Sequence, residues 1–143
     1  MVNNRIQSLA VILLILLVSC SEPENKGAGV IKNIYMPDSL QRPDSIAVAL
    51  IRAEVEDPDG LDDVETVFFY SLKPNGEYAN SGKGFDMMDD GTLGDEVAGD
   101  GIYSLGIQIN DQAQLGTYIF TFHMRDKAGN SAEEVVDSIK VFE

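Results

Sequence analysis

The chain has 143 residues, which is room for one domain but not for a second independent hydrophobic core. Its 24 acidic and 10 basic residues give a formal net charge of −14 at pH 7. A surface of this charge repels phosphate backbones and anionic lipid headgroups, so nucleic acid is excluded as a partner. The single cysteine excludes an internal disulfide.

The N-terminal residues have the composition of an export signal. Arg5 is followed by an uncharged apolar run from Leu9 to Val18, which is too short to span a bilayer as a helix. The run ends in Leu17-Val18-Ser19-Cys20, which resembles the lipobox of bacterial lipoproteins. The resemblance implies cleavage before Cys20 and lipid attached to its thiol, and an ordinary cleaved signal is the alternative. We therefore expect a signal peptide over residues 1–19 and an exported, lipid-anchored protein.

Residues 20–29 are polar and contain Pro and Gly, which predicts a flexible tether between the lipidated cysteine and the domain. Loss of residues 1–19 removes one arginine and no acid, which leaves 9 basic and 24 acidic residues and a net charge of −15. Glu22 and Glu24 resemble the acidic export signals of surface lipoproteins of the Bacteroidota, and a solvated linker explains them equally well. We expect the lipid on Cys20 to hold the protein at the outer membrane, with the periplasmic and cell-surface sides both open.

From Val30 onward the apolar residues alternate with period two, which predicts strands and no long amphipathic helix. Gly, Pro, Asn and Asp mark turns at intervals of roughly ten residues, the spacing of an antiparallel sandwich. In the second strand both faces are apolar over residues 46–50, which predicts either that both faces of this stretch are covered by other parts of the chain or that the strand contains a bulge. The expected strands, about seven, cover residues 30–36, 45–56, 64–72, 85–88, 103–109, 118–125 and 135–142.

Tyr118 lies three residues after Leu115, at the start of the penultimate expected strand. This placement resembles the tyrosine corner of immunoglobulin-like folds, which implies a hydrogen bond from the hydroxyl back to upstream backbone. A core aromatic at a strand start is the alternative.

Three segments together resemble bacterial extracellular immunoglobulin-like domains. They are Ala-Glu-Val-Glu-Asp-Pro-Asp-Gly at 53–60, Asp-Gly-Thr-Leu-Gly-Asp-Glu-Val-Ala-Gly-Asp-Gly-Ile-Tyr at 90–103, and Arg-Asp-Lys-Ala-Gly-Asn at 125–130. The resemblance covers residues 30–143 and implies an all-β, antiparallel sandwich of immunoglobulin-like or fibronectin III-like type. It implies no single activity, because one fold carries many functions.

The segment 89–103 is rich in aspartate and glycine, and it suggests calcium. Carboxylate and carbonyl oxygens are the ligands of Ca²⁺, although the spacing does not match an EF-hand. Aspartates that cap their own turns, with glycines at positive φ, account for the same residues. The candidate ligands are Asp89, Asp90, Asp95 and Asp100.

A second acidic group precedes the third expected strand. It is either a solvated hairpin end or, if brought beside the first loop, part of a joint calcium site. Its members are Asp57, Asp59, Asp62 and Asp63.

Catalysis finds little support, and we expect no enzyme. The one histidine, His123, falls on the alternate face of its strand, where we expect it to be solvated, and zinc sites need several His or Cys ligands. Tryptophan, the usual sugar platform, is absent. The sequence therefore favours a non-catalytic, lipid-anchored envelope protein that acts as a structural or interaction module, and its alternative is a calcium-stabilised module that binds a small ligand or a glycan.

A possible partner surface lies on the third expected strand. The aromatic residues at 68–70 cannot all face one core, because successive side chains of a strand point to opposite faces. If Phe68 and Tyr70 are exposed together, they form an apolar patch that can receive another envelope protein. Coverage by the connection over residues 73–84 is the alternative.

Overall fold

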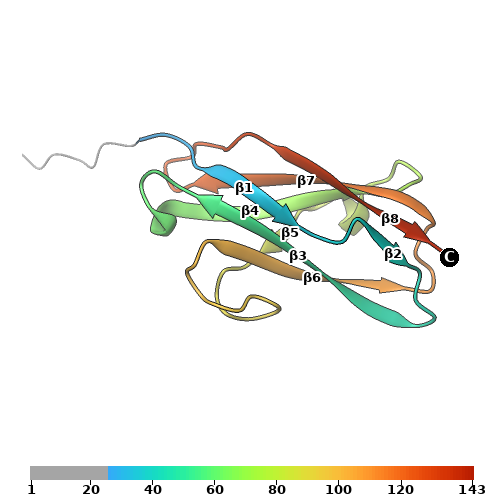
Figure 1. Ribbon diagram of the computed structural model, residues 1–143. Helices are drawn as coiled ribbons and strands as arrows, with labels where there is room; N and C mark the ends of the chain where they lie inside the picture. The colour runs from blue at the N-terminus through green and yellow to red at the C-terminus, as the bar shows by residue number, and fades with distance from the viewer. Residues whose placement is uncertain (1–25) are drawn as a thin grey trace, which may run out of the picture.

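The computed structural model describes residues 26–143 (Figure 1). The predicted signal peptide, Cys20, Glu22 and Glu24 lie outside the described residues. The two short 3-10 turns are η1 (Leu61–Asp63) and η2 (Ala79–Gly82). The strands are β1 (Val30–Tyr35), β2 (Ser39–Gln41), β3 (Ile46–Glu56), β4 (Val64–Leu72), β5 (Phe85–Met87), β6 (Ile102–Asn110), β7 (Gly116–Asp126) and β8 (Val135–Phe142).

Two sheets pack face to face as an immunoglobulin-like sandwich, which confirms the predicted fold class (Figure 1). One sheet has the order β1-β3-β6 and the other the order β2-β8-β7-β4-β5. Neighbouring strands are antiparallel except that β2 runs parallel to β8. Within residues 26–143 no helix is long and apolar enough to cross a membrane.

The core forms where the alternating apolar faces of the strands meet. In β3, Ile51, Ala53 and Val55 are buried while the residues between them reach solvent, as the alternation predicts. In β7, Phe120, Phe122 and Met124 are buried in the same way. Because period two sends alternate side chains to opposite faces, each strand contributes one face to the core.

Three details of the strands differ from expectation. No sequence pattern predicted β2, a three-residue strand whose pairing depends on β8. Register shifts fall in β1 and β4, whereas the register of β3 with β6 runs unbroken, so the predicted bulge at 46–50 is wrong. The same stretch is covered on both faces only in part. Ala49 is buried and Leu50 is half-buried, whereas Ile46 and Val48 are each 65% exposed.

The sandwich has two distinct ends. Val30 pairs with Glu56, so the described chain enters at the end where β3 finishes, and Ile46 pairs with Asn110 at the opposite end. These ends are roughly 33 Å apart along the eleven residues of β3. The acidic segments 57–63 and 126–130 lie at the entry end, and the C-terminus lies at the far end (Figure 1). The loop over residues 89–101 starts and finishes near the entry end and folds back over the middle of β3.

Candidate functional site

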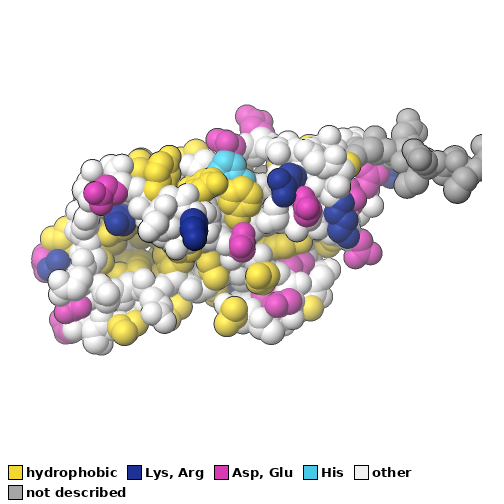
Figure 2. Space-filling view, turned by 180° about the vertical axis from the view of Figure 1, so that it is seen from behind, with side chains coloured by type: hydrophobic (Ala, Val, Ile, Leu, Met, Phe, Trp, Pro, Cys, Tyr) yellow, Lys and Arg dark blue, Asp and Glu magenta, His cyan; other side chains and the backbone are white. Residues whose placement is uncertain are grey.

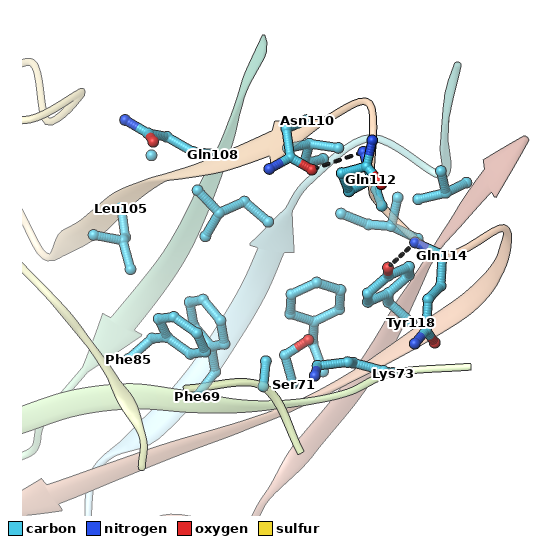
Figure 3. Close-up of a pocket in the computed structure, with 18 residues that line it drawn as sticks. Phe69, Ser71, Lys73, Phe85, Leu105, Gln108, Asn110, Gln112, Gln114 and Tyr118 are labelled. Atoms are coloured by element: carbon cyan, nitrogen blue, oxygen red, sulfur yellow. Dashed lines mark hydrogen bonds between the residues drawn. The ribbon is translucent and has the colours of Figure 1, made fainter. Parts of the chain in front are cut away.

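A cleft of about 480 Å³ opens between the two sheets at the far end of the sandwich (Figure 3). Its floor is the inner face of the five-stranded sheet, with Phe69, Phe120 and Ile139. Leu105 and Ile107 of β6 form the facing wall. The cleft exists because β5 is only three residues long and pairs with β4 only over Val67–Phe69, which leaves the gap beside β6 unfilled.

Neutral polar groups line the mouth of this cleft, and Lys73 is the one charged side chain among the residues that line it. Lys73 lies 3.9 Å from the carboxylate of Glu77. Cavities of this size with an apolar floor and a few polar groups at the mouth are typical of binding sites. The four amide side chains at the mouth are Gln108, Asn110, Gln112 and Gln114.

Two hydrogen bonds fix the turn between β6 and β7 beside the mouth (Figure 3). The backbone N–H of Gln112 donates to the side-chain oxygen of Asn110 at 2.9 Å, and the backbone N–H of Gln114 donates to the hydroxyl of Tyr118, also at 2.9 Å. The second bond is the contact that a tyrosine corner makes. Tyr118 thus holds one wall of the cleft in place.

Sequence reasoning missed the cleft. The signal for it was the glycine-spaced segment between β4 and β5, in which Gly76, Gly82 and Gly84 replace the apolar alternation that a longer β5 needs. Which side of the sandwich that segment leaves open depends on the packing of the sheets.

The Asp/Gly loop over residues 89–101 is held together by one carboxylate. Asp89 accepts backbone N–H bonds from Gly99 at 2.7 Å, from Asp100 at 3.3 Å and from Gly101 at 2.9 Å. These donors lie ten to twelve residues away along the chain. Asp89 therefore ties the start of the loop to its end, which goes beyond the local capping predicted from the sequence. The same carboxylate, after burial, raises the pKa of the Tyr103 hydroxyl.

The other aspartates of this loop accept more local bonds. Asp90 caps Thr92 through both its N–H and its hydroxyl, at 2.9 and 2.6 Å. Asp95, only 7% exposed, accepts the N–H of Gly91 at 2.6 Å. Asp100 accepts the N–H of Ile102 at 2.9 Å.

Of the four predicted calcium ligands, the structure brings three together. One carboxylate oxygen from each of Asp89, Asp95 and Asp100 lies within 4.8 Å of the others, and Asp90 is not part of this group. The loop folds back over β3, where a Cβ on Gly94 would lie 2.5 Å from Leu50, and Gly94 has φ +102°. Only glycine fits this approach and this backbone conformation. The metal role of the loop stays a prediction.

The second acidic group gathers around a buried aspartate that the sequence did not single out. Carboxylate oxygens of Asp57, Asp63 and Asp126 lie within 4.8 Å of one another, and neither Asp59 nor Asp62 belongs to this set. Among the described residues, the two groups of carboxylates stay separate rather than forming one joint site. The Oδ2 atom of Asp57 is buried without a hydrogen-bond partner.

In this second group the pKa values of Asp63 and Asp126 are shifted in opposite directions. Burial raises the pKa of Asp63, and the carboxylates of Asp126 and Asp57 raise it further. Burial also raises the pKa of Asp126, but hydrogen bonds from Asn130 and from the backbone of Gly129 outweigh burial, so its pKa lies below the usual range. The surroundings thus disfavour the charged form of Asp63 and favour the charged form of Asp126.

Aromatic side chains gather on the outer face of the five-stranded sheet (Figure 2). Phe68 stacks on His123 across the strand pair, with ring centroids 4.9 Å apart, and Tyr70 meets Phe68 edge-on at 5.6 Å. His123 is half-buried and contacts Glu134 at 3.4 Å, so the expectation of a solvated histidine is wrong. The physical reason is the register, which places His123 opposite Phe68.

The connection between β4 and β5 covers part of this aromatic face. Tyr78 packs on Tyr70 with ring centroids 6.1 Å apart, and a Cβ on Gly84 would lie 2.9 Å from the ring of Phe68. Phe68 and Tyr70 are therefore half-buried rather than fully open. Their role in binding a partner stays a prediction.

No protein-family model and no curated protein matches this chain. Among solved structures, it is similar to the PKD domain of an M14-like peptidase from Thermoplasmatales archaeon SCGC AB-540-F20, with 10% identity, a TM-score of 0.44, and 82% of this chain and 95% of that chain covered. It is also similar to AggA, the major subunit of aggregative adherence fimbriae type I from Escherichia coli, with 11% identity, a TM-score of 0.43, and 80% and 95% covered. The class of this protein, an immunoglobulin-like β-sandwich, rests on its own strand order.

Proposed function

We propose that this protein is a non-catalytic, lipid-anchored module of the bacterial cell envelope that binds a partner in the cleft between its sheets. The observation that carries the proposal is the lining of the cleft, with aromatic and aliphatic side chains on the floor, neutral amides at the mouth and one amine. Such a lining holds a ligand by apolar contact and orients it by hydrogen bonds. A segment of another protein and a glycan are the two classes of ligand that it suits.

The position of the cleft supports this proposal. The described chain enters the sandwich beside Glu56, and the cleft lies by Asn110 at the opposite end. If lipid on Cys20 fixes the entry end to a membrane, the mouth of the cleft faces away from that membrane. An anchored binding module needs this orientation to reach a partner.

The anchor is tested by fractionation of cells that express the full chain. We expect the wild-type chain to sediment with the envelope and to enter the detergent phase on Triton X-114 partition, because acyl chains on one cysteine hold a protein at a membrane. Cys20→Ala should remove both properties, whereas the neighbouring Ser21→Ala should keep them. Envelope association that survives Cys20→Ala would overturn the lipid anchor.

A second candidate function is calcium binding by the Asp/Gly loop, and it is favoured by the approach of Asp89, Asp95 and Asp100 to within 4.8 Å. Calcium at a hundred times its Kd should add about 2.7 kcal/mol to stability and raise the thermal midpoint by several degrees over a chelator control at matched ionic strength.

The double variant Asp95→Asn/Asp100→Asn is the matched control for calcium. It keeps an oxygen acceptor for the N–H groups of Gly91 and Ile102 and removes both charges. The calcium response should vanish in this variant while the chelated midpoint changes little. A wild-type midpoint that ignores calcium would identify the aspartates as turn residues only.

A further inference from the structure

The outer edge of β6 offers unpaired backbone groups along the cleft. β6 is the last strand of its sheet, and only its first part is covered, where Ser104 exchanges two backbone hydrogen bonds with Met88, at 3.0 and 2.7 Å. Both backbone groups of Ser104 therefore point away from β3. The N–H and C=O groups of successive residues in a strand point to opposite sides, so those of Gly106 and Gln108, like those of Ser104, point away from β3.

The odd-numbered residues around β6 are consistent with this alternation. The carbonyl of Gly101 accepts the N–H of Val55, and the N–H of Asp111 donates to Ser45, so both face the β3 side. Among the described residues, the outward groups of Gly106 and Gln108 meet no partner strand. The outward carbonyl of Asn110 accepts the N–H of Ala113, which closes the free stretch at its far end.

This free edge and the cleft are one feature. Gly106, Gln108 and Asn110 line the cleft, and the apolar floor of Phe69 and Phe120 lies opposite them. A strand laid beside β6 would hydrogen-bond to the edge through its backbone and direct alternate side chains onto the floor. A compact small molecule would leave the edge groups unpaired.

We propose that an extended segment of another envelope protein binds here as a fourth strand of the β1-β3-β6 sheet. The segment carries apolar side chains at alternate positions. Its chemistry follows from the lining, which contains no acidic side chain and one lysine, Lys73, in a chain of net charge −14. The segment is therefore uncharged where it covers the floor, since the one lysine already lies 3.9 Å from the carboxylate of Glu77. This inference deepens the function proposed above and rests on it.

The tether of the mature chain does not reach this site. Val48, the β3 partner of Gln108, is eight residues and roughly 26 Å along β3 from Glu56, where the described chain enters, whereas residues 20–25 span at most about 21 Å when fully extended. A second copy is disfavoured as well, because association would bring together two surfaces of high negative charge.

The experiment selects strands from a displayed library of random linear peptides on the full chain in detergent, and then measures amide hydrogen exchange with the selected peptides. In the free protein, the amides of Gly106 and Gln108 should exchange fast and those of Ile107 and Ile109 slowly. Selected peptides should alternate apolar and polar residues and slow exchange at Gly106 and Gln108 by about tenfold or more.

Two variants at one position separate pairing from simple apolar contact. Gln108→Pro removes the outward N–H, at an edge position where proline is tolerated, and should weaken peptide binding by about tenfold. Gln108→Ala removes the same side chain but keeps the N–H, so the loss of binding in Gln108→Pro beyond that in Gln108→Ala measures the backbone bond alone. If the proline variant fails to fold, N-methylation of alternate amides in the peptide tests the same bonds on the wild-type chain.

Several results would overturn the proposal. One is a library that yields no binder, and another is a bound peptide that leaves the amides of Gly106 and Gln108 unprotected from exchange. A third is protection of these two amides in the protein alone, which would indicate that a second copy or the chain itself already pairs with the edge. The fractionation experiment with Cys20→Ala is independent of these results. Failure of strand binding with an intact anchor would remove this inference and keep the anchored module.

Discussion

At the scale of single residues, Asp89 is the residue on which the Asp/Gly loop depends. Its two carboxylate oxygens accept N–H bonds from three successive residues at the far end of the loop. Hydrogen bonds from N–H groups to a carboxylate are stronger than those between neutral groups. The loop is thus closed by a side chain where another protein would use a strand pair.

Asp89→Ala should lower the free energy of unfolding by about 1–3 kcal/mol, because it leaves the N–H groups of Asp100 and Gly101 without their acceptor and leaves Gly99 only its 3.3 Å bond to the backbone carbonyl of residue 89. Urea unfolding followed by circular dichroism measures the change. The comparison variant is Asp90→Ala, which removes only the local cap on Thr92 and should cost less. Equal losses in the two variants would contradict the closing role of Asp89.

Asp63 should make stability depend on pH in the sense opposite to most aspartates. Its pKa is raised in the folded state, so its charged form costs stability above that pKa, and the cost is relieved as pH falls through it. Asp63→Asn should therefore raise the thermal midpoint near neutral pH, and the gain should disappear at acidic pH. Asp44→Asn, at an exposed position far from the group, should leave the midpoint unchanged.

Asp126 should make stability depend on pH in the opposite direction to Asp63. Its folded pKa is lowered, so it contributes stability above the unfolded pKa, and that stability is lost as pH falls through the folded value. A pH series of thermal midpoints for Asp63→Asn and the wild type separates the two contributions. A gain from Asp63→Asn that persists at low pH would show that repulsion is not its cause.

At the scale of elements, the turn from β6 to β7 is fixed by the bond between Tyr118 and Gln114. Tyr118→Phe should lower the free energy of unfolding by about 0.5–1.5 kcal/mol, which is the usual worth of one such hydrogen bond. Tyr70→Phe is the matched control, because its hydroxyl makes no hydrogen bond among the described residues. Chemical denaturation of both variants tests this, and a larger loss for Tyr70→Phe would contradict the role of the corner.

The strands that could be predicted from sequence are those whose own pattern specifies them. β3, β4 and β7 are long, alternate with period two and end in turn residues, so local physics is enough to place them. β2 has three residues and gains its strand conformation only from the parallel pairing with β8.

The candidate sites were harder to predict because they depend on contacts between distant residues. The stack of Phe68 on His123 joins positions that only the register of β4 with β7 brings together. The buried Asp126 looked like one more turn residue, and its approach to Asp63 follows from the pairing of Val64 with Asp126. The cleft arises from the short length of β5 against β4, and composition carries no sign of how two sheets leave a gap.

At the scale of the whole molecule, the sandwich separates its chemistry between its ends. The two carboxylate groups lie toward the end where the chain enters, and the apolar, amide-rimmed cleft lies toward the other end. The residues that line the cleft include no acid, although beside its mouth Asp111 accepts a hydrogen bond from the side chain of Gln112 and Glu77 lies 3.9 Å from Lys73. The lining of the cleft thus carries little charge although the chain as a whole is strongly acidic.

The order β1-β3-β6 also has a mechanical consequence. If the proposed lipid anchor holds the end where the chain enters through β1, and the proposed guest strand on β6 leaves at the far end, tension between membrane and partner would run parallel to the strands. Antiparallel inter-strand hydrogen bonds lie perpendicular to that direction, and a pull along the strands loads them in shear, all together rather than one after another. In that arrangement the three-stranded sheet would resist force applied along its strands.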